Sequence, residues 1–330
     1  MRPNSNALLQ VEGLRTWFPI RSGILRRVTG HVRAVDGVDL EIRKGQTLAL
    51  VGESGCGKTT LGRSILRLVE ATEGNVIYDG MDVLSLSLDA FHAYRRRIQV
   101  IMQDPASALD PRMTVRNAIA EGMEAFGIVI STRETTNRVA EFMDLVRLDP
   151  GMMSKYPHEL SGGQRQRVCI ARALAVNPEL IICDEAVSSL DVSIQAQILN
   201  LLRDLQAERG LTYLFITHDL GVVRYFADRI AVMYLGRVVE EGPAERLMDA
   251  PRHPYTQALL SSVPSLDPDR PEAAPAALGD VPSPARPPSG CHYHPRCTQR
   301  LDHCDRDDPP MVEFEDGCSR CFLSEGQGET

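Results

Sequence analysis

The residues best suited to chemistry stand in a glycine-rich run, GESGCGKT, at residues 52–59. Its glycines allow tight turns that point backbone N–H groups at an anion, and a helix beginning just after them adds partial positive charge. Lys58 would bridge the β- and γ-phosphates of a nucleotide, and Thr59 would place its hydroxyl on Mg²⁺. The predicted phosphate-binding residues are Gly52, Glu53, Ser54, Gly55, Cys56, Gly57, Lys58, Thr59 and Thr60.

An acidic pair, Asp184 and Glu185, ends the apolar run ELIICDE. Asp184 could hold Mg²⁺ through water, and Glu185 could orient the attacking water and accept its proton. A third apolar run, LTYLFITHD, ends at His218. Because the carboxyl ends of parallel strands meet at one sheet edge, His218 is expected within reach of the γ-phosphate.

A second phosphate-binding element is indicated by LSGGQ at residues 160–164. Ser161, Gly162 and Gly163 offer N–H groups at the start of a helix whose apolar face is predicted from RQRVCIARAL. A single chain that already has one phosphate loop does not need a second phosphate-binding element for the same nucleotide. The pair makes sense if two chains meet head to tail, so that each ATP is clamped between two subunits.

The elements that must position these residues follow from the hydrophobic pattern. Residues 46–51, 179–185 and 211–219 are predicted to be buried strands, and apolar residues recur at helical spacing between them. Alternating strands and helices predict an α/β fold with a parallel sheet. Residues 104–160 carry helical patterning without strand signals, which indicates a helical insertion.

Composition divides the chain. We predict a main domain at 1–263, with a helical subdomain at about 104–165, a Pro/Ala-rich linker at 264–289 and a cysteine-rich extension at 290–330. The net charge of −8 lies mostly beyond residue 264, so nothing indicates a nucleic-acid surface. No apolar run predicts a secretory signal or a spanning helix, so a cytosolic chain that reaches a membrane only through a partner is expected.

Taken together, these motifs resemble the nucleotide-binding subunits of ABC transporters over about residues 8–321. The resemblance implies a P-loop NTPase core with a parallel sheet, an antiparallel β subdomain, a helical insertion carrying LSGGQ, and a small loop-rich C-terminal extension. It also implies ATP hydrolysis, with ATP and Mg²⁺ bound. DEAVSSLD lacks the Pro and Thr that most of the family has after the acidic pair, but no catalytic residue is lost.

The same resemblance assigns further site residues. Gln103 in VIMQDP would sense Mg²⁺ and the γ-phosphate, Asp191 of SSLD would organise the site across the dimer, and His218 would be the switch histidine. Gln164, the last residue of LSGGQ, is also expected to contact the nucleotide. Adenine would stack on an aromatic residue of LRTWFPI, with Phe18 favoured and Trp17 the alternative.

The segment RHPYTQALL resembles the hallmark of the oligopeptide/dipeptide importer branch. This implies a peptide-importing machine with a second ATPase subunit, two transmembrane permeases and an extracytoplasmic solute-binding protein, placing the chain on the cytoplasmic face of the membrane. Import of nickel or another small solute is one alternative, and a soluble ABC ATPase outside transport is another. On physical grounds alone, the segment predicts a turn at Pro254 and a short amphipathic helix.

Five cysteines crowd the predicted extension. Cys291, Cys297 and Cys304 are followed by either Cys318 or Cys321 as a fourth thiol. Four thiolates suit an iron–sulfur cluster or a zinc ion, and a short cytosolic segment without a core needs a cross-link other than a disulfide. Resemblance to the branch's extension favours a [4Fe–4S] cluster with Cys321 as fourth ligand. Zinc, or no metal at all, remains the alternative.

Overall fold

A computed structural model describes residues 7–23, 26–262 and 277–325. Residues 264–276 of the predicted linker and 326–330 of the predicted extension lie outside these ranges. The chain forms two compact units, the first made of residues 1–42, 47–84 and 217–330, and the second of residues 43–46 and 85–216. Each unit is described below by itself.

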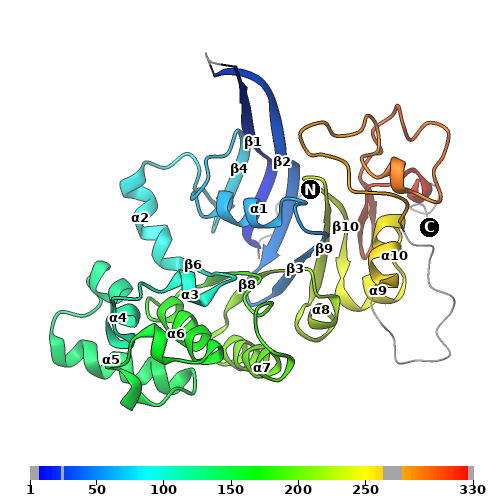
Figure 1. Cartoon of the computed structure of the whole chain (residues 1–330). Helices are drawn as coiled ribbons and strands as arrows, with labels where there is room; N and C mark the ends of the chain where they lie inside the picture. The colour runs from blue at the N-terminus through cyan, green and yellow to red at the C-terminus, as the bar shows by residue number, and fades with distance from the viewer. Residues whose placement is uncertain (1–6, 24–25, 263–276, 326–330) are drawn as a thin grey trace. The chain divides into compact units, whose positions relative to one another are not determined.

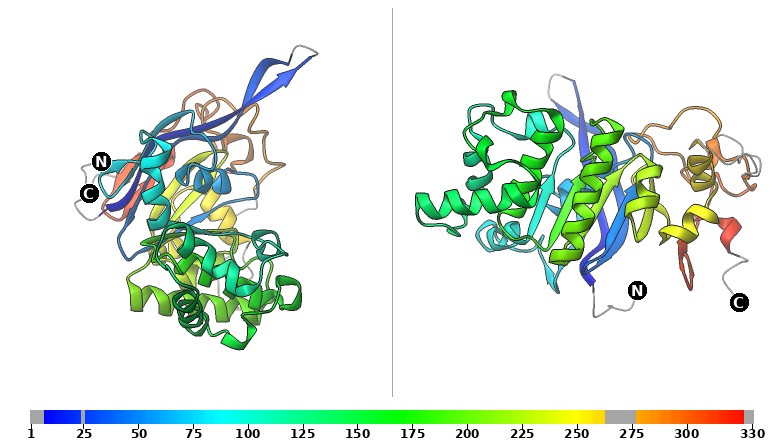
Figure 2. Two further views of the ribbon diagram at one scale, coloured as in Figure 1. Left: turned by 90° about the vertical axis from the view of Figure 1, so that its left-hand side faces the viewer. Right: turned by 90° about the horizontal axis from the view of Figure 1, so that it is seen from below.

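The first unit contains an antiparallel sheet of order β2-β1-β4-β5. Its strands are β1 (Ala7–Ser22), β2 (Arg27–Arg43), β4 (Glu73–Tyr78) and β5 (Met81–Asp82). β1 and β4 pair antiparallel, with Leu9 opposite Tyr78. The long strands β1 and β2 run side by side, as both views in Figure 2 show. The sheet confirms the expected antiparallel subdomain.

A second sheet of the same unit carries the phosphate loop. β3 (Thr47–Val51), buried at every position, pairs in parallel with β9 (Arg229–Tyr234), which pairs antiparallel with β10 (Arg237–Pro243). The helices of the first unit include α8 (Leu220–Phe226), which packs against β3, and α9 (Ala244–Asp249), which packs against β9 and β10 (Figure 1). The unit also contains α1 (Lys58–Ile65) and α10 (Pro254–Ser261). α10 begins at Pro254, as predicted, with His253 as its N-cap.

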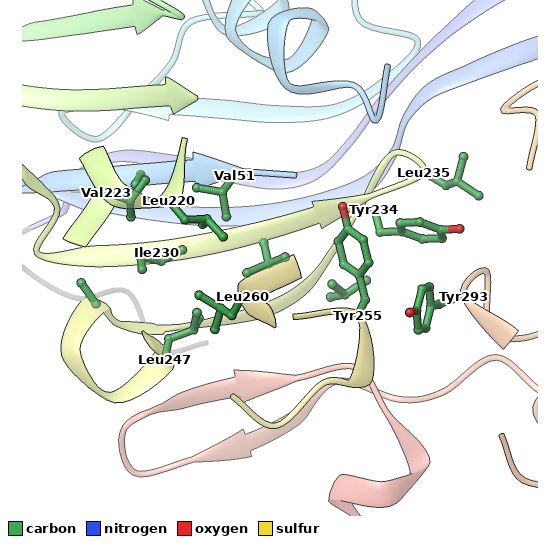
Figure 3. Close-up of a cluster of buried hydrophobic side chains, with 14 residues drawn as sticks. Val51, Leu220, Val223, Ile230, Tyr234, Leu235, Leu247, Tyr255, Leu260 and Tyr293 are labelled. Atoms are coloured by element: carbon green, nitrogen blue, oxygen red, sulfur yellow. The ribbon is translucent and has the colours of Figure 1, made fainter. Parts of the chain in front are cut away.

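The extension joins this sheet. β11 (Val312–Phe314) and β12 (Gly317–Ser319) form a hairpin, and β12 pairs antiparallel with β10, with Cys318 opposite Glu241. The extension also contains the short 3-10 turns η3 (His294–Arg296) and η4 (Phe322–Ser324). Tyr293 enters a buried cluster with Val51, Tyr234 and Tyr255 (Figure 3). The expected loop-rich appendage therefore shares the sheet and the core of the first unit.

The second unit contains three parallel strands of a sheet, with β7 between β6 and β8, as the alternating pattern predicted. Its strands are β6 (Ile98–Ile101), β7 (Leu180–Asp184) and β8 (Thr212–Thr217). Its helices and 3-10 turns are α2 (Leu88–Arg97), α3 (Pro105–Ala108), α4 (Val115–Ala125), α5 (Thr132–Leu145), η1 (Pro150–Met152), η2 (Pro157–Glu159), α6 (Gly162–Leu174) and α7 (Val192–Arg209). α4, α5 and α6 pack together, which is the expected helical insertion (Figure 1).

Side-chain caps fix where the helices of the insertion begin. Thr114 accepts a hydrogen bond from the Asn117 N–H at the start of α4, and Ser131 does the same for Glu134 at the start of α5. Such caps are local signals that the sequence carries. None of the helices in the described ranges combines the length and the apolar character needed to cross a bilayer.

Candidate functional site

The phosphate loop closes around the Lys58 side chain. Its ammonium group donates hydrogen bonds to the carbonyl oxygens of Gly52 at 2.7 Å and Glu53 at 3.0 Å, and only 4% of the residue is exposed. Burial raises the pKa of the neighbouring Cys56 thiol, so that it stays neutral beside the ammonium. A buried cation at the mouth of the loop is what a phosphate-binding site requires.

Two glycines make this loop sterically possible. Gly52 has φ 154° and Gly57 has φ 111°, and a Cβ on Gly57 would lie 2.0 Å from the Ala34 carbonyl oxygen. A Cβ on Gly52 would lie 2.2 Å from the Met233 carbonyl oxygen. Only glycine tolerates both the backbone angle and this close approach. Gly57 also forms the N-cap of α1, so the helix N-terminus faces the loop.

The two candidate adenine-stacking residues differ in their surroundings. Phe18 is 40% exposed on β1. Trp17 is half-buried, donates its indole N–H to Asp36 at 3.1 Å, and has the Arg33 guanidinium 4.9 Å from its ring centroid. An exposed ring is available to stack on a base, whereas the Trp17 ring already has partners, and this favours the prediction of Phe18.

The predicted catalytic carboxylate of the second unit has a defined partner. The Gln103 side-chain amide donates a hydrogen bond to the Glu185 carboxylate at 2.8 Å. Glu185 has φ 50°, an unusual angle for a residue other than glycine, and its N–H donates to the Ile216 carbonyl oxygen at 2.9 Å. The strained backbone turns the chain as it leaves β7, directly after Asp184. The structure thus brings together the predicted base and the predicted γ-phosphate sensor.

The signature LSGGQ is a helix start. Ser161 and Gln164 form a capping box, in which the Ser161 hydroxyl accepts from the Gln164 N–H and the Gln164 side chain accepts from the Ser161 N–H. Gly162 and Gly163 form the first turn of α6, whose N–H groups have no partner within a helix. A Cβ on Gly163 would lie 2.7 Å from the Ile194 side chain on α7, which explains glycine at this position.

Asp191 is the exposed N-cap residue of α7 and makes no side-chain capping hydrogen bond. Its carboxylate therefore does not cap its own helix. In the first unit, His218 is exposed and follows β8 immediately before Asp219, the N-cap of α8. The predicted site residues are thus divided between the two units: Phe18, the phosphate loop and His218 lie in the first, and Gln103, LSGGQ, Asp184, Glu185 and Asp191 lie in the second.

The cysteines of the extension separate into two sets. Cys291, Cys297, Cys304 and Cys321 line one pocket, whereas Cys318 lines a different groove beside Glu241. Burial, with a smaller contribution from the other three cysteines, raises the pKa of Cys321 to about 12. In the described ranges, no group of three or more metal-binding side chains is placed so that it could hold a metal ion. The four predicted cysteines thus share one pocket, but they are not placed as a ready-made site for one ion.

Two residues that contact the phosphate loop were not predicted from the sequence. Arg296 and Tyr255 both contact Glu53, the second residue of the loop. Tyr255 lies inside the RHPYTQALL segment, and Arg296 is the only arginine between Cys291 and Cys297. Their partner could not be predicted because Arg296 and Glu53 are 243 residues apart.

Comparisons with known proteins find similar sequences over most of the chain. A family model described as ABC transporter matches residues 35–188, and one described as the oligopeptide/dipeptide transporter C-terminal region matches residues 239–304. The chain is 49% identical to a probable peptide ABC transporter ATP-binding protein, y4tS, of Sinorhizobium fredii, covering 95% of this chain and 88% of that protein. It is 47% identical to the oligopeptide transport ATP-binding protein AppF of Bacillus subtilis, covering 97% of each.

Solved structures show the same fold. A dimeric post-hydrolysis state of the ATP-binding cassette MJ0796, bound to ADP and Pi, has a TM-score of 0.63 and 31% identity, covering 72% of this chain and 98% of that one. CbiO1 of Clostridium perfringens, part of an ABC transporter complex, has a TM-score of 0.64 and 26% identity, covering 74% and 92%. The chain therefore belongs to the ABC transporter family, as an ATP-hydrolysing subunit. Within the family it falls in the branch with the oligopeptide/dipeptide transporter C-terminal region.

Proposed function

We propose that this chain binds and hydrolyses ATP, between two head-to-tail subunits, to power the import of di- and oligopeptides across a membrane. The observation that carries the proposal is the buried Lys58 ammonium held across the mouth of the phosphate loop. The peptide substrate is supported by the match of residues 239–304 and by relatives named as peptide transport proteins. The geometry of the loop supports ATP binding, and the match of residues 239–304 supports the peptide substrate.

In the proposed mechanism, Lys58 leaves the loop carbonyls for the β- and γ-phosphates when ATP binds. Thr59, Asp184 and Gln103 would hold Mg²⁺, and hydroxyl, carboxylate and amide oxygens are the donors that this hard cation prefers. Mg²⁺ neutralises phosphate charge when bound. Adenine would stack on the exposed ring of Phe18.

Glu185 is the proposed general base. Its carboxylate orients the attacking water and accepts the water's proton as the γ-phosphate is cleaved. The 2.8 Å hydrogen bond from Gln103 would orient this carboxylate before ATP arrives. His218 would contact the γ-phosphate. Across the dimer, Ser161, Gly162 and Gly163 would bind the phosphates of the partner's ATP, with Gln164 and Asp191 at the same interface.

Replacing the base tests the mechanism. Glu185→Gln keeps the size of the side chain and its hydrogen bond to Gln103, but it cannot accept a proton. We expect ATP turnover to fall by roughly 10²–10⁴-fold, while ATP still binds and traps a closed dimer on size-exclusion chromatography. Turnover at the wild-type rate would reject Glu185 as the base.

As partners we propose a second, different ATPase subunit, two transmembrane permeases and an extracytoplasmic solute-binding protein. The permeases would hold the chain at the cytoplasmic face of the membrane. This proposal is supported by the relatives that are named as ATP-binding proteins of peptide transport. Co-purification of the tagged chain with membrane proteins would identify them.

We propose further that Cys291, Cys297, Cys304 and Cys321 ligate an iron–sulfur cluster. Four thiols lining one pocket have the donor chemistry for such a group, which would act as a structural cross-link of the extension. Anaerobic purification with iron and sulfide analysis tests this. Cys321→Ser is expected to lose the iron, and Cys318→Ser, outside the pocket, to retain it. Equal iron content in both variants, or none in the wild type, would contradict the proposal.

A further inference from the structure

Glu53, in the phosphate loop, is contacted by residues from far along the chain. Its carboxylate receives two hydrogen bonds from the Arg296 guanidinium, at 2.8 and 3.0 Å. Its N–H donates to the Tyr255 hydroxyl at 2.9 Å. Its carbonyl oxygen accepts from the Lys58 ammonium at 3.0 Å. The side chain and both backbone polar groups of Glu53 are therefore engaged at once.

The two distant partners are buried beside aromatic rings. Tyr255 is 1% exposed, and its ring lies 4.6 Å from that of Tyr234 and 5.3 Å from that of Tyr293, centroid to centroid (Figure 3). Arg296 is 8% exposed, and its guanidinium lies 5.8 Å from the ring centroid of Tyr234 and 6.0 Å from that of Tyr293. A planar guanidinium that binds a carboxylate through two parallel hydrogen bonds fixes direction as well as distance.

Fixing Glu53 also fixes Lys58. The Lys58 ammonium rests on the carbonyl oxygens of Gly52 and Glu53, which are neighbouring peptide groups. A rotation of the Glu53 backbone would move one of these oxygens and leave the buried ammonium with fewer partners. The Arg296 charge also offsets the Glu53 carboxylate, which would otherwise add an unpaired negative charge to a loop that must accept phosphates.

We propose that Arg296 and Tyr255 are positioning residues for ATP binding: acting through Glu53, they hold the phosphate loop in the conformation that aims Lys58. The C-terminal extension thereby sets the affinity of the chain for ATP. This inference rests on the proposed role of Lys58 as a phosphate ligand. It adds that the loop is held from outside, by α10 and by the turn η3 between Cys291 and Cys297.

The test compares Arg296→Gln with Arg296→Lys in the full chain. Binding is measured with a fluorescent ATP analogue, turnover in the assembled transporter, and stability by thermal unfolding. Arg296→Gln is expected to raise the Kd and the KM for ATP about tenfold, the loss of one charge-assisted hydrogen-bonded pair, with kcat within about twofold, because the loop holds ground state and transition state alike. Arg296→Lys keeps the charge but not the two parallel bonds, so it is expected to fall between.

Arg300→Gln is the matched control. Arg300 lies in the same extension, pairs with Asp305 at 2.7 Å on the surface, and makes no contact with the loop. Its Kd for ATP is expected to equal that of the wild type. A rise in Kd equal to that of Arg296→Gln would contradict the proposal, as would an Arg296→Gln variant that melts earlier but binds ATP with wild-type affinity.

Two further variants keep the proposal testable if Arg296→Gln does not fold. Glu53→Gln removes the carboxylate, and Tyr255→Phe removes only the hydroxyl; each is expected to weaken ATP binding, and wild-type binding by both would overturn the proposal. Lys58→Ala separates the proposed role of Lys58 as a phosphate ligand from the proposed positioning role of Arg296 and Tyr255. If it binds ATP normally, the role of Lys58 is wrong. If it loses ATP while Arg296→Gln, Glu53→Gln and Tyr255→Phe bind normally, only the positioning role is wrong.

Discussion

The phosphate loop and the C-terminal extension lie in the same unit but are held together in different ways. The loop is closed by contacts within eight residues, such as those of Lys58 with Gly52 and Glu53. The extension is held by distant partners: Arg237 pairs with Asp308, and the Arg320 N–H donates to the Val239 carbonyl oxygen. Local contacts therefore close the loop, and Arg296 and Tyr255 brace it at the single residue Glu53, whereas the extension takes its shape from the sheet it joins.

This difference teaches which substitutions should act where. In the loop, the space around each backbone atom decides the outcome, because two glycines have backbone carbonyls against them. In and beneath the extension, buried charges decide how much stability a substitution removes, because the extension contains few helices and strands. Matched pairs of variants can test the distinction in each region.

The largest effect is expected within the loop, for Gly57→Ala compared with Gly55→Ala. Both glycines have positive φ, 111° and 80°, but a Cβ on Gly57 meets the Ala34 carbonyl oxygen at 2.0 Å, while a Cβ on Gly55 meets nothing within 4 Å. Gly57→Ala is expected to cost about 4 kcal/mol of unfolding free energy, and Gly55→Ala about 1 kcal/mol. Urea denaturation measures both. Similar losses would show that backbone angle, rather than space, limits the loop.

The next largest loss of stability is expected for a buried charged pair beneath the extension, Arg246 with Glu240. Glu240 is fully buried and accepts hydrogen bonds from the Arg246 guanidinium at 2.8 Å and from the N–H groups of Arg252 and His253. Arg246→Gln leaves this carboxylate without its cation, and we expect a loss of about 3 kcal/mol in unfolding free energy.

Arg300→Gln, which breaks an exposed pair, is the control for that measurement and should cost less than about 1 kcal/mol. If the two variants unfold at the same urea concentration, the buried pair beneath the extension contributes no more stability than an exposed pair, and the contrast between the two regions is lost.

The smallest effect is a pH dependence at the start of α10, between the two regions. His253 is buried, its Nδ1 accepts the Tyr255 N–H at 3.0 Å, and burial lowers its pKa to about 3. The unfolded chain takes up this proton near pH 6.5, so the contribution of His253 to stability is complete above that pH and is lost as the pH falls toward 3. Burial likewise lowers the pKa of His292 to about 4.

Substitution separates the two histidines. His253→Asn can still cap α10 but cannot titrate, so between pH 7 and 5.5 it should lose about 1 kcal/mol less unfolding free energy than the wild type. Urea denaturation at the two pH values gives this difference. An identical loss in both proteins would mean that His253 does not titrate on unfolding in this range.

Much of the phosphate loop and of the strand positions could be predicted from the sequence, since both depend on neighbouring residues. Residues 46–51, QTLALV, predict a short buried strand and contain β3, and GESGCGKT has its glycines where turns need them. LSGGQ could be predicted as a helix start because Ser161 and Gln164 are three residues apart, the spacing of a capping box.

Contacts between distant residues could not be predicted in this way. The β11–β12 hairpin pairs with β10, and the only local signal for it is Asp316 followed by Gly317. Cys318 lies within β12, whereas Cys321 follows that strand as the N-cap of η4 and lines the pocket of the other three cysteines, a difference that only the fold reveals. The positive φ of Glu185 and the pairing of Arg296 with Glu53 have no signature in sequence at all.

The measurement that most directly tests ATP-driven peptide import is uptake of a labelled oligopeptide into proteoliposomes holding the complete transporter, with ATP on the side of this chain. With the wild-type chain, uptake should require both ATP and the solute-binding protein, and with Lys58→Ala it should fall to the level measured without ATP. Uptake at the wild-type rate by Lys58→Ala, or ATP turnover that no peptide stimulates, would contradict the proposed function.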